Sequence, residues 1–244
     1  MSLLLVRAAD RAVTSTDWLV SQHGFSFGDH YDPQDTHHGV LLVHNDELVA
    51  PGQGFDTHPH AETEIVTWVL SGSLVHHDSN GNRGVIHPGL AQRMSAGTGL
   101  THSERNDDAE NSSEPAHYIQ MWVLPDETGH NPSYEQRDIS TELAAGGLLP
   151  LASGDRRHDS AIRIRNAGAT LWVARLATGA SATLPSGRFT HLFVTRGAVT
   201  TEGLTLATAD TLRAADLGGT RVTAVSDAEL LIWTMHSALS DLFT

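Results

Sequence analysis

The sequence predicts an all-β protein built from two similar barrels or sandwiches in tandem. Runs of four to eight β-branched and apolar residues, bounded by Gly, Pro, Asn and Asp, recur along the 244 residues, and long helical patterns are scarce. Gly72 in VTWVLSGSL aligns with Gly197 in LFVTRGAVT at an offset of 125 residues, with a strand before and a hairpin after each glycine. The short, evenly spaced strands are typical of a barrel or sandwich, and the offset indicates that the unit occurs twice.

The first half supplies a series of strands joined by tight turns. Asn80-Gly81 predicts one hairpin turn, and Pro88-Gly89 predicts another. The strands that we expect around these turns are Thr63 to Leu70, Ser73 to His77, Arg83 to His87, Ala91 to Ser95 and Tyr118 to Leu124.

The second half repeats this style after a linker. The span from Pro125 to about Asp155 is rich in Pro, Gly and Asp, with one short helix expected over Ser140 to Ala145. We therefore expect a first domain over residues 1–135 and a second over 136–244. The strands expected in the second domain are Thr170 to Leu176, His191 to Thr195, Ala198 to Thr201, Leu204 to Ala207, Arg221 to Val225 and Glu229 to Met235.

Composition narrows the possible functions. The formal net charge of −14 repels phosphate backbones and anionic lipid head groups, so direct binding to nucleic acid or to a membrane surface is not expected. The chain has no cysteine, which excludes disulfides, thiolate nucleophiles and cysteine-ligated metals. The N-terminal apolar run of MSLLLVRAADRAV is too short for a signal peptide or a membrane span, so we expect a cytoplasmic protein.

Two histidines stand one residue apart in FDTHPHAETE. Alternate residues of an extended strand face the same side, so His58 and His60 present both imidazoles to one space, while Pro59 points outward. Two ring nitrogens on one face can bind a metal, although a hydrogen-bonded pair of histidines is the plainer interpretation of this segment alone.

A second pair with the same spacing changes that balance. His102 and Glu104 lie in SAGTGLTHSERN, on another expected strand. Three imidazoles and a carboxylate converging inside a barrel would bind one divalent first-row metal and leave positions open for water, substrate or oxygen. Glu64 has the same parity as His58 and His60, so spacing alone does not decide between Glu64 and Glu104 as the carboxylate ligand. A carboxylate that is not a ligand can still orient a ligand imidazole.

The motifs resemble those of the cupins, and more closely those of the pirin family. GQGFDTHPHAETE fits the first cupin motif, and HSERN fits the end of the second. The segments that are similar to bacterial pirin-like quercetin 2,3-dioxygenases cover nearly the whole chain: SFGDHYDP, FDTHPHAETEIVTWVLSGSLVHHDSNGNRGVIHPG, QRMSAGTGLTHSE, AHYIQMWVLPDETGHNPSYEQ and GRFTHLFVTRGAVT.

The resemblance implies a bicupin, which consists of two tandem jelly-roll β-barrels with a metal site in the N-terminal barrel only. Carried over by position, the metal ligands are His58, His60, His102 and Glu104, and Glu64 becomes the residue that orients a ligand from behind. The second domain is expected to be cupin-like without a metal, because Thr183 and Pro185 stand 125 residues after His58 and His60.

The resemblance also implies a metal-dependent oxidoreductase. The expected reaction is cleavage of a flavonol such as quercetin, or of a related enolisable aromatic compound, by O2 with release of carbon monoxide. Fe(II) is the first expectation for the metal, with Mn, Ni, Co or Zn as further possibilities. Glu104 is the expected catalytic base, with Glu64 as the reserve. Two alternatives stay open: a non-enzymatic, metal-responsive partner of a regulatory protein, and a cupin enzyme with a different substrate.

Overall fold

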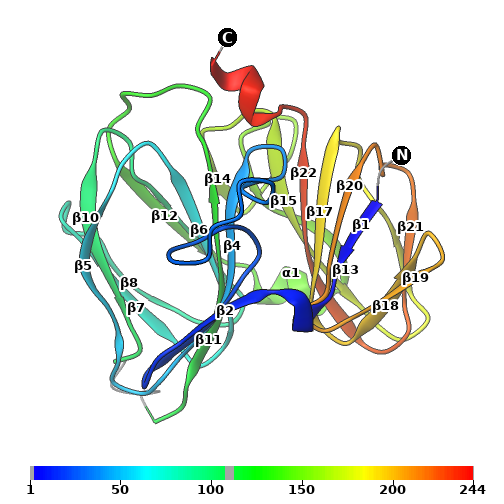
Figure 1. Ribbon diagram of the computed structural model, residues 1–244, viewed down its shortest axis with the longest axis horizontal. Coiled ribbons are helices and arrows are strands. Elements are labelled where there is room, and N and C mark those ends of the chain that lie inside the picture. Colours follow the sequence, from blue (N-terminus) through cyan, green and yellow to red (C-terminus); the bar gives the residue numbers. More distant parts are fainter. Residues whose placement is uncertain (1–2, 108–112, 244) are drawn as a thin grey trace.

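The computed structural model describes residues 3–107 and 113–243, and two β-barrels stand side by side in it (Figure 1). Each barrel pairs a seven-stranded sheet with a four-stranded sheet. No helix in the described part of the chain is both long and apolar enough to cross a membrane. The expected all-β bicupin architecture is confirmed.

The first barrel contains eleven strands in two sheets. The seven-stranded sheet has the order β12-β9-β6-β11-β4-β3-β2, and the four-stranded sheet has the order β5-β10-β7-β8. The bounds are β2 Ala12–Ser15, β3 Leu19–His23, β4 Leu41–Val49, β5 Gly54–His60, β6 Glu64–Ser71, β7 Leu74–Asp78, β8 Arg83–Ile86, β9 Leu90–Ser95, β10 Leu100–Arg105, β11 Ala116–Val123 and β12 Ser133–Asp138.

The second barrel repeats this arrangement. Its sheets have the orders β1-β20-β17-β22-β15-β13-β14 and β16-β21-β18-β19. The bounds are β1 Leu3–Val6, β13 Gly147–Ser153, β14 Ile162–Arg163, β15 Ala169–Leu176, β16 Ser181–Thr183, β17 Phe189–Arg196, β18 Ala198–Thr201, β19 Leu204–Ala207, β20 Thr211–Ala215, β21 Arg221–Ala224 and β22 Ala228–Met235. The helical pieces are η1 Ala8–Asp10, α1 Ser140–Ala144 and η2 Leu239–Phe243.

Two edge strands are exchanged between the barrels: β1 precedes the strands of the first barrel but joins the second, and β12 directly precedes β13 of the second barrel but joins the first. β1, at the start of the chain, pairs with β20 of the second barrel, and β12 pairs with β9 of the first barrel. The expected domain boundary between residues 135 and 136 falls inside β12, so the chain does not divide between the barrels at a single point. The span expected as a linker contains the short helix expected in it, α1, but also two unexpected strands, β12 and β13. Its Pro and Gly residues mark the turns between these elements.

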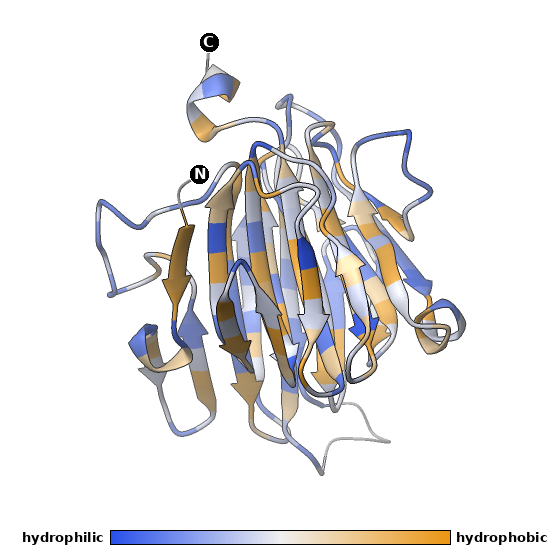
Figure 2. Cartoon of the chain, turned by 90° about the vertical axis from the view of Figure 1, so that its right-hand side faces the viewer, coloured by the Kyte–Doolittle hydropathy of each residue, from blue (hydrophilic) through white to orange (hydrophobic). Residues whose placement is uncertain are grey.

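The main hydrophobic core lies between the two barrels. In β15, Leu171 and Val173 belong to this shared core, whereas Trp172 and Ala174 fill the interior of the second barrel. Successive side chains of a strand point to opposite faces, so such a strand is buried on both sides and reads as an unbroken apolar run. Figure 2 shows hydrophobic segments along the strands of the second barrel.

β4 is missing from the expected strands although it is central to its sheet. Its middle residues, His44 to Glu47, are polar and hide the apolar alternation of a strand. Three of these residues, His44, Asn45 and Glu47, are buried. The carboxylate of Glu47 accepts a hydrogen bond from Ser21 at 3.1 Å, and the partly exposed Asp46 lies 2.7 Å from Nε2 of His117, whereas the ring nitrogens of His44 have no hydrogen-bond partner.

Trp233 tests the shared core. Its side chain is fully buried, and its indole N–H lies 3.2 Å from the sulfur of Met121 in the other barrel. We expect Trp233→Ala to lower the free energy of unfolding by about 3 to 5 kcal/mol, because it leaves a large cavity between the barrels. Urea unfolding measures this loss, and Val225→Ala, at a side chain that is 52% exposed, is the control with a change within about 0.5 kcal/mol. Equal stability of both variants would contradict the shared core.

Candidate metal centre

Three neighbouring strands of the first barrel carry the candidate site. In the order β5-β10-β7, His58 lies opposite His102, which lies opposite Asp78. The next row toward the end of β10 places Glu104 opposite His76. The sheet therefore sets polar side chains from three strands in two adjacent rows.

The local sequence explains why these side chains face inward. Along β10, Leu100, His102 and Glu104 are buried and the residues between them are partly exposed, as strand alternation requires. A bulge between His102 and Glu104 shifts the register against β5. Gly54 makes this close pairing possible, because a Cβ at that position would lie 2.4 Å from the backbone oxygen of Glu104.

The imidazoles of His58, His60 and His102 converge as expected. Their ring centroids are 4.5 to 4.9 Å apart, and one ring nitrogen of each lies within 4.8 Å of the others. Nδ1 of His58 donates to the carbonyl oxygen of Asp56 at 2.7 Å, which leaves its Nε2 lone pair free. Nε2 of His60 and of His102 are buried without a hydrogen-bond partner. Unpartnered buried nitrogens that face one another fit a divalent metal ion.

The electrostatics keep the rings of His60 and His102 neutral. Burial lowers the pKa of His102 to about 3, helped by the neighbouring imidazoles of His58 and His76. Burial also lowers the pKa of His60 to about 4, helped by His102 and His58. A neutral imidazole offers the lone pair that a metal requires, so protons do not compete for these two nitrogens near pH 7.

Glu104 belongs to a second group of potential metal ligands, with His76 and His102, which shares His102 with the group of three histidines. One of its oxygens lies within 4.8 Å of ring nitrogens of His102 and His76, whereas the triad of His58, His60 and His102 forms without it. Its Oε2 accepts a hydrogen bond from the amide of Gln120 at 2.6 Å, and Oε1 of Gln120 accepts one from the indole of Trp122 at 3.0 Å. The bond from Trp122 fixes the orientation of the Gln120 amide. Burial raises the pKa of Glu104.

Glu64 has a different environment from the one expected. Its Oε2 accepts hydrogen bonds from Oγ of Ser95 at 2.7 Å and from the backbone N–H of Arg165 at 3.1 Å. Among the described contacts, none of its hydrogen bonds reaches a histidine. Glu64 lies on β6 in the opposite sheet, so its strand parity with His58 does not bring it to the same site. It connects the first barrel to a segment of the second.

His76 is the site residue that sequence reasoning missed. It is fully buried on β7, and its Nδ1 lies 3.4 Å from Nδ1 of His102. The available signal was His76-x-Asp78, a third pair with the same spacing as His58 and His60. The adjacent His77 obscured it, because a doublet of histidines does not show which of the two faces inward.

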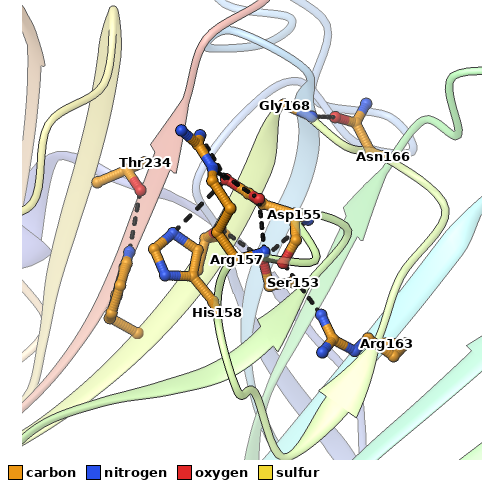
Figure 3. Close-up of polar contacts among 10 residues, drawn as sticks. Ser153, Asp155, Arg157, His158, Arg163, Asn166, Gly168 and Thr234 are labelled. Atoms are coloured by element: carbon orange, nitrogen blue, oxygen red, sulfur yellow. Dashed lines mark hydrogen bonds and ion pairs between the residues drawn. The ribbon is translucent and has the colours of Figure 1, made fainter.

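The described part of the second barrel has no comparable group. Among the described residues, the groups of three potential metal ligands all lie in the first barrel. The second barrel has a cavity of about 370 Å³ bordered by Trp172, His158 and Pro185, the counterpart of His60. Figure 3 shows the loop beside it, where Asp155 is paired with Arg157 at 2.7 Å.

The pKa of His102 predicts how stability depends on pH in the metal-free protein. Between its folded value of about 3 and its ordinary value of 6.5, only the unfolded chain binds this proton, so the contribution of His102 to stability is lost as the pH falls. We expect His102→Gln to make the fall in unfolding free energy between pH 6.5 and 4.5 shallower, by at most about 1.4 kcal/mol per pH unit. Urea unfolding at several pH values measures this slope. The exposed His77→Gln is the control, and equal slopes in all three proteins would contradict the assignment.

Comparison with known proteins agrees with this geometry. Residues 6–123 match the Pirin family model, and residues 151–235 match the quercetinase C-terminal cupin domain. A Mycobacterium tuberculosis protein named "Putative quercetin 2,3-dioxygenase" is 56% identical over 236 residues, which cover 96% of each chain. The quercetin 2,3-dioxygenase of Escherichia coli K12 is 36% identical over 233 residues, which cover 96% of this chain and 98% of that protein.

Solved structures show the same relationship. The crystal structure of the bacterial pirin YhhW from Escherichia coli in complex with nickel(II) matches with a TM-score of 0.87 and 34% identity, covering 97% of this chain and all of that one. The high identity and the nearly complete coverage extend over both barrels. The chain therefore belongs to the pirin family, in the branch whose members carry the name quercetin 2,3-dioxygenase.

Proposed function

We propose that the chain is a metal-dependent dioxygenase that cleaves a flavonol or a related enolisable aromatic compound with O2 and releases carbon monoxide. The observation that carries this proposal is the convergence of three imidazoles, two of which have buried Nε2 atoms without a partner, beside a buried carboxylate. The names of the relatives support the substrate class and the reaction.

The metal would be held by His58, His60 and His102, with Glu104 as the fourth ligand. Fe(II) is our first choice, and Mn, Co, Ni or Zn would also accept this set of donors. When bound, the metal supplies a Lewis acid that favours ionisation of a coordinated hydroxyl group and provides open positions for substrate and oxygen. The crystal structure of the Escherichia coli pirin in complex with nickel(II) supports a divalent ion as the metal.

Glu104 would remove the proton from the 3-hydroxyl of the flavonol. Burial raises the pKa of this carboxyl, which makes its carboxylate a better proton acceptor than an exposed one. The hydrogen bond from Gln120 holds one carboxylate oxygen in place beside His102 and His76. Deprotonation gives an electron-rich enolate that O2 can attack, and ring cleavage yields a phenolic ester and carbon monoxide.

The surroundings of His60 suit an aromatic substrate. A hollow of about 680 Å³ is bordered by His60, Pro59, Ala61 and Leu100, among other residues, whereas His58, His102 and Trp122 do not border it. The indole of Trp122 lies 4.8 Å from the His60 ring, centroid to centroid, at an interplanar angle of 81°. A flavonol that enters beside His60 would therefore meet an aromatic wall.

Aerobic turnover of quercetin is the direct test. We expect protein reconstituted with Fe(II) to release carbon monoxide from quercetin, and we expect His58→Ala to abolish this release because one metal ligand is lost. Gas analysis of carbon monoxide together with the loss of quercetin absorbance measures both results. His236→Ala, at an exposed histidine of the second barrel, is the matched control and should retain activity.

The metal content decides what a negative result means. One bound metal per chain without carbon monoxide release, across the divalent metals named above, would contradict the dioxygenase proposal. The metal-responsive partner role or a different substrate would then replace it.

Glu104→Gln tests the role of the base separately. The substitution preserves shape and hydrogen bonding but removes the proton acceptor, so we expect kcat to fall by about 10² to 10⁴-fold while some metal binding is kept. Steady-state kinetics and metal analysis of the same samples measure the two effects. Glu202→Gln, on an exposed turn of the second barrel, is the control. Full activity of Glu104→Gln would refute the assignment.

A further inference from the structure

His76 and Asp78 lie behind His102, on the side away from His58. All three belong to adjacent strands, because β7 pairs with β10 and places Asp78 opposite His102. His76 and His102 are buried, with ring centroids 5.2 Å apart and the two Nδ1 atoms at 3.4 Å. Nε2 of His76 lies 3.5 Å from Oδ2 of Asp78, within ion-pair distance although Nε2 forms no hydrogen bond in the structure, and both side chains are almost completely shielded from solvent.

Asp78 is fixed as the acceptor at the end of this row. The side-chain amide of Asn82 donates to its Oδ2 at 2.8 Å, and the backbone N–H groups of Asn80 and Asn82 donate to its Oδ1 at 2.9 and 3.0 Å. Burial opposes ionisation of this carboxyl, but these hydrogen bonds outweigh it and lower its pKa. The turn at Asn80 to Asn82 therefore presents a fixed carboxylate to Nε2 of His76.

The position of this carboxylate sets the proton on each ring in turn. A carboxylate accepts only, so Nε2 of a neutral His76 carries the proton that faces Asp78 and Nδ1 is left as an acceptor. Nδ1 of His102, at 3.4 Å, must then carry the proton that faces His76. Consequently Nε2 of His102 has a free lone pair. This nitrogen is one of the buried ring nitrogens that have no hydrogen-bond partner.

We propose that His76 and Asp78 are positioning residues, which hold His102 as the Nδ1–H tautomer with its Nε2 lone pair aimed at the metal. The inference deepens the proposed function, since it rests on the same metal centre. His58 obtains the same tautomer from a backbone carbonyl, that of Asp56, whereas His102 depends on two side chains. A carboxylate behind a ligand imidazole fixes its orientation and raises its basicity.

His76 could instead be a ligand, since one of its nitrogens lies within 4.8 Å of His102 and Glu104. A metal on that side would use Nδ1 of His102 and leave the buried Nε2 atoms of His60 and His102 without partners. An unpartnered buried nitrogen is costly. A metal between His58, His60 and His102 satisfies two of these atoms and leaves Nε2 of His76 facing the carboxylate of Asp78, so the arrangement with His76 behind His102 is favoured.

Metal affinity is the first readout. Chelator competition with Co²⁺ is measured on His76→Phe, His76→Gln, Asp78→Asn and, as matched control, the exposed neighbour His77→Phe. Phenylalanine retains a ring that can stack on Tyr134, as His76 does at a centroid distance of 4.8 Å, but it cannot accept a hydrogen bond from His102. We expect Co²⁺ affinity to fall about 10- to 100-fold in His76→Phe, to recover in part in His76→Gln, and to be unchanged in His77→Phe. Glutamine can accept from His102 and donate to Asp78.

The tautomer of His102 is the second readout, and it requires neither metal nor substrate. Long-range ¹⁵N–¹H NMR of the metal-free protein should show His102 with its proton on Nδ1, and this preference should weaken in Asp78→Asn and His76→Phe. Should His76→Phe fail to fold, His76→Gln and Asp78→Asn still report both quantities. Failure to cleave quercetin would not affect either result.

Two outcomes would overturn the inference. One is an unchanged Co²⁺ affinity and an unchanged His102 tautomer in folded His76→Phe and Asp78→Asn. The other is the loss of one nitrogen ligand from bound Co²⁺ in His76→Phe, seen by X-ray absorption, which would make His76 a ligand rather than a positioning residue.

Discussion

The pairing of β10 with β5 on one side and β7 on the other is the constraint on which the candidate site depends. β10 contributes His102 and Glu104, and its two neighbours contribute the remaining imidazoles and Asp78. A slip of one residue in either pairing would turn a whole row of side chains to the opposite face. The register is held by burial of Leu100 on the inner face, by the close approach of Gly54 and by the turn at Asn80 to Asn82.

Much of this arrangement could be predicted from the sequence, because the signals are local. The His58 and His60 pair shows a strand face directly, and the hairpin turn at Asn80-Gly81 locates β7 and β8. The contacts across strands could not be predicted. Strand parity suggested that Glu64 faces the histidines, but parity does not reveal which sheet a strand joins, and β6 lies in the opposite one. The role of His76 requires the β7 to β10 register, which no local pattern contains.

The two barrels have the same strand arrangement but differ in whether they carry metal-ligating side chains. Strand for strand, β5 corresponds to β16 and β10 to β21, and each pair forms the same antiparallel contact. The positions of His58 and His60 hold Thr183 and Pro185 in the second barrel, which removes the nitrogen donors while the sheet is kept. The second barrel thus supports the first chiefly through the shared core, in which Trp233 meets Met121.

The exchange of edge strands has a consequence for how the chain reaches its native state. β1 is synthesised well before its partner β20, which lies more than 200 residues later in the chain, with Leu3 opposite Ala214. Contacts so distant in sequence have a high loop-closure cost and slow the folding of a domain. The edge of the second barrel therefore stays open until most of the chain has left the ribosome. Closing it is expected to be a late event. A cut between β12 and β13 would separate β1 from β20, leaving β1 without its partner in one fragment and β20 at an open sheet edge in the other.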